Sequence, residues 1–134
     1  MNDSANPSKA FFIFGSASAG IAVAAGAFGA HGLKNTLPGE MLAIFETAVR
    51  YQMYHSLALV ATGWALNGWN GEKSAGFKIA GWSFIIGIIL FSGSLYALSL
   101  TGVGMLGAIT PLGGVAFITG WLMLAWSARK SKAP

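Results

Sequence analysis

One short stretch of this 134-residue chain carries most of the residues that could do chemistry. In ETAVRYQMYH, residues 46–55, a carboxylate, a guanidinium, two tyrosines and a histidine stand directly before apolar sequence. If the stretch is helical, Glu46, Arg50 and Tyr54 share one stripe, because residues four apart lie on the same helix face. Tyr51 and His55 share a second stripe. Ionisable groups at membrane depth are costly and normally face a bundle interior, so a localised function would lie here.

Two interpretations of these groups stay open, and we favour the first. In the structural one, Glu46 and Arg50 pair along their helix and His55 bonds to a neighbouring serine or tyrosine, which holds a bundle in register. In the functional one, a polar cavity opens to the outside, Glu46 or His55 carries a proton, and Arg50 anchors an anion.

Other chemistry has little support in the sequence. His31, Glu46 and His55 show no known ligand spacing, so we expect no metal site. The chain has no cysteine, which excludes disulfides and thiolate metal sites. It also lacks a catalytic triad, a phosphate-binding loop and a haem motif. We therefore expect no catalytic residues and no cofactor.

The composition indicates a membrane protein. Hydrophobic residues make up 54% of the chain and charged residues only 9%, which is too little polar surface to coat a soluble protein of this size. The 19 glycines fit the same class, because glycine lets helices approach closely in lipid. The net charge of +4 comes from scattered bases that flank apolar segments, so it indicates anchoring at a membrane and not nucleic-acid binding.

We predict an all-α membrane protein with four transmembrane helices in a compact bundle. The predicted spans are residues 10–30, 47–68, 79–100 and 105–126, each long enough for a bilayer core of about 30 Å at 1.5 Å per residue. Amphipathic turns from residue 39 onward extend the second span at its N-terminal side. A polar tail at 1–9 and a basic tail at 129–134 flank the single membrane domain, residues 10–128.

Two segments have alternative interpretations. Residues 10–30 could be a cleaved signal peptide, but the apolar run is longer than usual, and small residues recur at every fourth position as on a packing face. Pro111 either kinks the fourth helix, which we favour, or starts it, leaving 104–109 as a short re-entrant piece. The residues predicted for helix packing are Gly20, Ala22, Gly26, Gly29 and Ala30.

The basic residues predict cytoplasmic termini. Four spans place both termini and the 67–78 loop on one side, together with six of the eight lysines and arginines, and leave Lys34 and Arg50 on the other side. The same path brings polar residues from four segments to a similar depth in the outer half. The predicted polar network comprises His31, Glu46, Arg50, Tyr51, Tyr54, His55, Ser92, Ser94, Tyr96 and Thr110.

Four motifs occur in a characteristic order: GAFGAHGL at 26–33, ETAVRYQMYH at 46–55, LFSGSLY at 90–96 and GAITPLGG at 107–114. Together they resemble the YgdD-like membrane proteins, the domain of unknown function 423, over nearly the whole chain. The resemblance implies a small multi-spanning protein of the bacterial inner membrane that retains its first span. It implies no activity, substrate or catalytic residue.

These features predict a non-enzymatic accessory or interaction protein of the membrane, because the chain is short, its loops are minimal and no catalytic constellation is present. The alternative is a small-solute or proton-coupled transporter or channel that uses the outer polar network. The expected partners are the lipid bilayer and either a second copy of the chain or another membrane protein. We expect no nucleic-acid partner.

Overall fold

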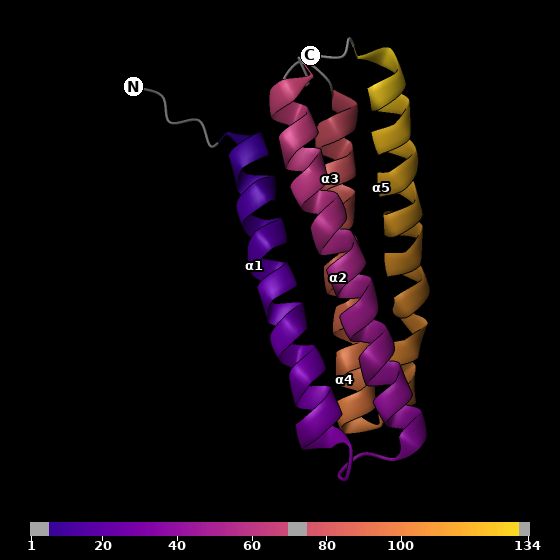
Figure 1. Ribbon diagram of the computed structural model, residues 1–134. Helices are drawn as coiled ribbons and strands as arrows, with labels where there is room; N and C mark the ends of the chain where they lie inside the picture. Colours follow the sequence, from indigo (N-terminus) through magenta and orange to yellow (C-terminus); the bar gives the residue numbers. More distant parts are fainter. Residues whose placement is uncertain (1–5, 70–74, 132–134) are drawn as a thin grey trace.

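The computed structural model describes residues 6–69 and 75–131, and this part of the chain is helical almost throughout (Figure 1). Four long helical segments follow one another. They are α1 (Pro7–Phe28) with the π-helical turn η1 (Gly29–Leu33), α2 (Gly39–Gly68), α3 (Ala75–Gly87) with the π-helical turn η3 (Ile88–Ser92) and α4 (Gly93–Thr101), and the 3-10 helix η4 (Gly104–Ala108) with α5 (Thr110–Lys130).

The segments form an up-and-down bundle. α1 starts and α5 ends at the same end of the bundle, whereas the turns from α1 to α2 and from α4 to α5 lie at the opposite end (Figure 1). α2 packs against α1, α3 and α4, and α5 packs mainly against α3 and η3. α2 is therefore the central helix, and the most polar segment of the sequence runs along the interior of the bundle.

The first helix begins at Pro7, earlier than the predicted start at residue 10. The Asn6 side chain caps it by accepting a bond from the Ser8 amide at 3.0 Å, and proline suits the first turn because its missing N–H would be unpaired there anyway. The Ser8 hydroxyl donates to the Gly63 carbonyl oxygen of α2 at 2.8 Å. Residues 7–9 of the predicted polar tail thus belong to α1, and residues 1–5 lie outside the described residues.

The predicted break between the third and fourth spans is confirmed at Gly102. This glycine ends α4 in the left-handed conformation, with φ of 72°, which residues with a Cβ rarely adopt. The predicted loop at 67–78 is shorter than expected, since α2 reaches Gly68 and α3 starts at Ala75, and its residues 70–74 lie outside the described residues. At the C-terminus α5 extends to Lys130, so the predicted basic tail is partly helical, and residues 132–134 are likewise outside the described chain.

Pro111 starts a helix instead of kinking one. It lies in the first turn of α5, and the residues before it form the separate 3-10 helix η4. This differs from the kinked span that the sequence favoured. The physical reason is that proline in a helix interior loses one backbone hydrogen bond and clashes with the preceding turn, whereas in the first turn it loses nothing.

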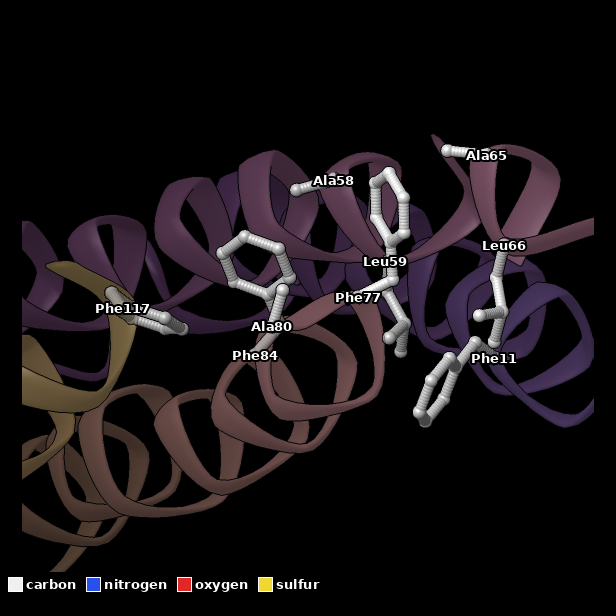
Figure 2. Packing of buried hydrophobic residues seen from close by; sticks show 9 residues of the cluster. All are labelled: Phe11, Ala58, Leu59, Ala65, Leu66, Phe77, Ala80, Phe84 and Phe117. Carbon is white, nitrogen blue, oxygen red and sulfur yellow. The ribbon is translucent and has the colours of Figure 1, made fainter. Parts of the chain in front are cut away.

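The hydrophobic core lies between α2 and α3, towards the end of the bundle where α1 starts. Figure 2 shows phenylalanine rings of α1, α3 and α5 in one cluster with Leu59 and Leu66 of α2, and the Phe117 ring lies at the opposite end of the cluster from Leu66. Six large side chains are at most 3% exposed: Phe11, Leu59, Leu66, Phe77, Phe84 and Phe117. The core is contiguous across all four segments, which makes α1 and α5 parts of a single packed unit.

Glycines bring α1 and α2 into backbone contact. A methyl group added at Gly15 would lie 2.7 Å from the Ser56 carbonyl oxygen, and one added at Gly63 would lie 2.7 Å from the Ser8 carbonyl oxygen. Such close approach between helices is typical of packing in lipid, where small residues at the contact let backbones meet.

Only part of the predicted packing face makes this contact. Ala22 and Gly29 are buried against α2, and Gly26 lies beside Val49, but Gly20 and Ala30 are exposed. A regular fourfold spacing holds for one face only over short distances, because 3.6 residues complete each turn. The face that meets α2 therefore starts at Ser8 and passes through Gly15 and Ala22 to Gly29.

Three segments of the described chain are long and apolar enough to cross a membrane: Pro7–Leu33, Ala75–Thr101 and Gly104–Lys130. α2 is not among them, so four transmembrane helices are not confirmed. Polar residues such as Gln52, Ser56 and Thr62 lower the hydropathy of α2. These three side chains are buried inside the bundle, so they are not presented to lipid. Hydropathy measures composition alone, and it does not distinguish a polar helix in solvent from one enclosed by apolar helices.

Candidate functional site

The candidate site is a set of buried polar side chains on α2. Gln52 and Ser56 lie one turn apart and point towards α1, while His55 points towards α3 and α5. A helix that is surrounded on several sides can present different residues of one turn to different neighbours. The polar groups of α2 therefore form two clusters, one around Gln52 and one around His55.

Gln52 joins three helices. Its amide nitrogen donates to the Ser18 carbonyl oxygen of α1 at 3.0 Å and to the Ser18 hydroxyl at 3.3 Å. Its amide oxygen accepts a bond of 2.7 Å from the Tyr96 hydroxyl of α4. The Ser56 hydroxyl also donates to the Ser18 hydroxyl, at 2.7 Å. This Gln52 cluster, made of Ser18, Gln52, Ser56 and Tyr96, links α1, α2 and α4 through side chains that satisfy one another.

Serines of the third segment extend these links. The Ser92 hydroxyl, which is fully buried, donates to the Ala48 carbonyl oxygen of α2 at 2.9 Å. Ser94 and Thr110 share a hydrogen bond of 2.7 Å, which fastens α4 to the start of α5. In lipid, hydrogen bonds between helices contribute to association because the hydrocarbon offers no alternative partner. All four segments of the bundle are thus connected by polar contacts.

His55 is enclosed by aromatic rings. Its imidazole stacks on Phe117 of α5 with centroids 3.4 Å apart and planes within 8°. Phe84 and Trp121 pack around the same ring, and His55 is 5% exposed. Nδ1 lies 2.7 Å from the Tyr51 carbonyl oxygen, and the Trp121 indole N–H donates to Nε2 at 3.1 Å.

These two bonds define the protonation state of His55. An indole N–H can only donate, so Nε2 must accept and carries no proton. Nδ1 then holds the single proton and donates it to the Tyr51 carbonyl oxygen. The ring is therefore neutral, and both nitrogens are occupied within the protein. No nitrogen of His55 is left to bind a metal or a substrate, and among the described residues no group of three possible metal-binding side chains comes together.

The structure brings together only part of the predicted polar network. His55, Ser92, Ser94, Tyr96 and Thr110 take part in bonds between helices. Tyr51 contributes its carbonyl oxygen to His55, and its ring, 39% exposed, stacks on Phe91 with centroids 4.5 Å apart. The remaining four predicted residues, which are exposed and lie outside the buried clusters, are His31, Glu46, Arg50 and Tyr54.

Sequence reasoning missed the neutral members of the site. Gln52 lies inside the stretch 46–55, but the network was predicted from its ionisable neighbours. An uncharged amide costs less to bury than a charge, which favours Gln52 for the interior. Ser18 and Ser56 are short and common in membrane helices, so their types carry little signal. Trp121 lies 66 residues beyond His55 in the sequence, and only the packing of α5 shows that its N–H faces the histidine.

Comparison with known proteins identifies the family. The family model described as "Protein of unknown function (DUF423)" matches residues 25–114, a range that includes both Gln52 and His55. A UPF0382 membrane protein of Staphylococcus saprophyticus is 51% identical over 116 residues, which cover 87% of this chain and 93% of the relative. The UPF0382 membrane protein YwdK of Bacillus subtilis is 48% identical over 122 residues, which cover 91% and 98%. No solved structure matches.

Both relatives align with this chain along almost their whole length and are named as membrane proteins. Their names carry no reaction, ligand or partner. The apolar segments of the described chain agree with membrane insertion. This chain therefore belongs to the DUF423 family, and it is a helical membrane protein.

Proposed function

We propose that the chain is a multi-pass protein of the bacterial inner membrane in which α2 crosses the bilayer as the central one of four spans. The course of the chain supports this: α1 and the α3–α4 segment run in the same direction, so the segment between them has to return across the bundle (Figure 1). The low hydropathy of α2 is compatible with crossing, because its polar side chains are bonded inside the bundle.

The proposed membrane domain comprises residues 10–128, with both termini in the cytoplasm. Lys9, Arg129 and Lys130 lie at the end of the bundle where α1 starts, together with Trp126, over whose ring the Lys130 ammonium sits at 3.8 Å. Basic residues are enriched on the cytoplasmic side and tryptophans at membrane interfaces. The opposite end, with the turn at 34–38, then faces outward.

Cysteine labelling tests this topology directly, because the chain has no cysteine of its own. We expect Thr36→Cys, in the α1–α2 turn, to react with a membrane-impermeant maleimide in intact cells. We expect Ser131→Cys, at the end of α5, to react only after permeabilisation. Equal labelling of both sites in intact cells would contradict four spans, and the reverse pattern would contradict cytoplasmic termini.

For the function itself, we propose an accessory or interaction protein that acts through its exposed surface. The observation that carries this proposal is the saturation of the buried polar groups of α2. Gln52 uses its nitrogen and its oxygen, His55 uses both nitrogens, and the Ser56 and Thr62 hydroxyls donate within the protein. A site that moves solutes or protons needs polar groups that can exchange hydrogen-bond partners. The polar groups of α2 are instead bonded to fixed partners within the protein.

An exposed stripe on α2 is the surface that a partner would contact. Tyr54, Leu57 and Trp64 follow one another at helical spacing and are 55%, 56% and 60% exposed. α2 is otherwise enclosed by α1, α3 and α4. Large aromatic side chains are frequent anchors in protein interfaces. The partner we propose is another membrane protein or a second copy of the chain.

Reconstitution and photo-crosslinking together test the accessory function against transport. In proteoliposomes with an imposed pH gradient, we expect the purified protein to give no proton flux above that of empty vesicles. In native membranes, a photoreactive amino acid at Tyr54 should give a discrete crosslinked product, while the same amino acid at Leu122 on α5 should not. Proton flux that is lost in the His55→Phe variant would contradict the accessory function and would identify the protein as a transporter.

A further inference from the structure

A groove runs between α1 and α2 at the end of the bundle that carries the turn at 34–38. Its volume is about 230 Å³, which is below the roughly 300–1,000 Å³ of pockets that enclose a drug-sized ligand. The groove therefore suits a narrow, elongated group that lies along the protein surface. The lining residues are one glycine each of α1 and η1, two apolar residues of α2 and two charged ones of α2, namely Gly26, Gly29, Phe45, Val49, Glu46 and Arg50.

The two charges of the groove have opposite sign and lie one helical turn apart on α2. Both side chains are exposed, and within residues 6–69 and 75–131 neither takes part in a hydrogen bond or an ion pair. Gly26 lies beside Val49 and Gly29 beside Phe45, so the charges stand level with the last turns of α1. In the orientation proposed above, this is the depth at which long charged side chains reach the headgroups of the outer leaflet.

We propose that this groove binds a zwitterionic phospholipid with an ethanolamine headgroup. Arg50 holds the lipid phosphate, Glu46 holds the primary ammonium, and the first part of one acyl chain lies over Gly26 and Gly29. Guanidinium suits phosphate oxygens, and an ammonium donates charge-assisted hydrogen bonds to a carboxylate. The glycines keep the floor of the groove low, since they carry no side chain to fill it. The assignment rests on the proposed transmembrane orientation.

Charge complementarity separates this lipid from other occupants. An anionic glycerol lipid would satisfy Arg50 through its phosphate but bring no cation to the Glu46 carboxylate. A choline headgroup has no N–H with which to donate to Glu46. A free phosphate would leave the apolar floor uncovered. The ethanolamine lipid matches both charges and the apolar floor with one molecule.

Native mass spectrometry of the full-length protein, purified without lipid and mixed with defined lipids, tests the proposal. We expect the ethanolamine lipid to bind on the order of tenfold more tightly than the glycerol or choline lipid with the same acyl chains. One hydrogen bond to a charged group accounts for a difference in affinity of this size. Arg50→Gln should weaken the binding of the ethanolamine lipid by a similar factor. Glu46→Gln should remove the preference over the glycerol lipid.

Matched variants separate the groove from general effects. Lys34→Gln and Glu40→Gln remove exposed charges near the same end and should leave lipid binding unchanged. Gly26→Leu fills the groove and should reduce binding, whereas Gly20→Leu, on the same helix with open space around it, should not. A Cβ at Gly26 would meet Val49 at an ordinary 3.4 Å, so a side chain can start there without displacing backbone, and thermal unfolding of the variant checks that it folds.

Three results would overturn the proposal. Arg50→Gln and Gly26→Leu could both bind the ethanolamine lipid as the wild type does. The glycerol lipid could bind best. The wild type could form lipid-free dimers that Gly26→Leu abolishes, which would assign the groove to a second copy of the chain. The cysteine labelling decides the orientation separately, so lost lipid preference with correct labelling would count against the groove alone.

Discussion

Gly15→Ala is expected to lower the free energy of unfolding by about 1–3 kcal/mol, the usual cost of overpacking a filled contact. The added methyl group would lie 2.7 Å from the Ser56 carbonyl oxygen and 2.9 Å from the Val60 amide nitrogen. These are backbone atoms, which cannot rotate away as a side chain can. The two helices would have to separate, and the bonds that Gln52 and Ser56 donate to Ser18 of α1 would lengthen with them.

Gly20→Ala is the matched control, because it makes the same change in the same helix. Gly20 is exposed, and nothing lies within 4 Å of an added Cβ. Alanine is the better helix former by up to about 1 kcal/mol, so this variant should be neutral or slightly more stable. Thermal unfolding of both variants in the same detergent measures the difference. Equal stability of the two would show that α1 and α2 are not in backbone contact.

The second large effect is expected at Gln52. Gln52→Leu keeps the approximate size of the side chain but leaves the Tyr96 hydroxyl without its acceptor and removes the bond from α2 to the Ser18 carbonyl oxygen. A buried polar group that loses its partner costs about 1–3 kcal/mol, and the Tyr96 hydroxyl is such a group. Because the amide joins three helices, we expect loss of both stability and assembly of α1 and α4 onto α2.

A double-mutant cycle with Tyr96→Phe isolates the bond between these two residues. If the 2.7 Å bond forms, the double variant should be less destabilised than the sum of the single ones by about 0.5–2 kcal/mol. Tyr54→Phe removes the same hydroxyl from an exposed tyrosine and should show no coupling to Gln52. Strict additivity of Gln52→Leu and Tyr96→Phe would mean that the bond contributes nothing to stability.

The sequence allowed the fold to be predicted in outline, because long uncharged segments and one glycine break are read directly from composition. Gly102 ends α4 as predicted, and the four helical segments are present. The predicted span at 47–68 is not confirmed, because α2 is too polar by hydropathy, and the partners of its Gln52 and His55 come from helices distant in sequence. The sequence alone could not place Pro111 at a helix start, because a proline within an apolar run can either start a helix or kink one.

The candidate site was predicted in its location but only in part of its members. The stretch 46–55 contains both Gln52 and His55, the two centres of the buried clusters. Glu46 and Arg50 were placed in the same network, yet both side chains are exposed. Spacing alone could not separate the stripes, because α2 packs against neighbours on several sides and only its contacts show which stripe is left open.

The third segment shows a further limit of periodicity. Counting regular turns from Phe84 places residues 91 and 98 on its inward face, but the buried residues are Ser92 and Ser99, at 1% and 2% exposed. The π-helical turn η3 causes this slip by one position, since the Gly93 amide donates to Ile88, five residues earlier. From Ser92 onward, the inward-facing positions therefore come one residue later than the periodicity of the first half of the helix predicts.

The same turn has a consequence for how the length of this segment can vary. A π-helical turn holds one residue more than an α-helical turn along the same backbone path, so α3 and α4 keep the orientation that an uninterrupted helix one residue shorter would give them. Loss of Ile89, which is 63% exposed, would convert η3 to regular helix without rotating α4. A deletion within α4 would instead turn every following side chain by about 100°. Single-residue insertions and deletions in this family should therefore gather at 88–92.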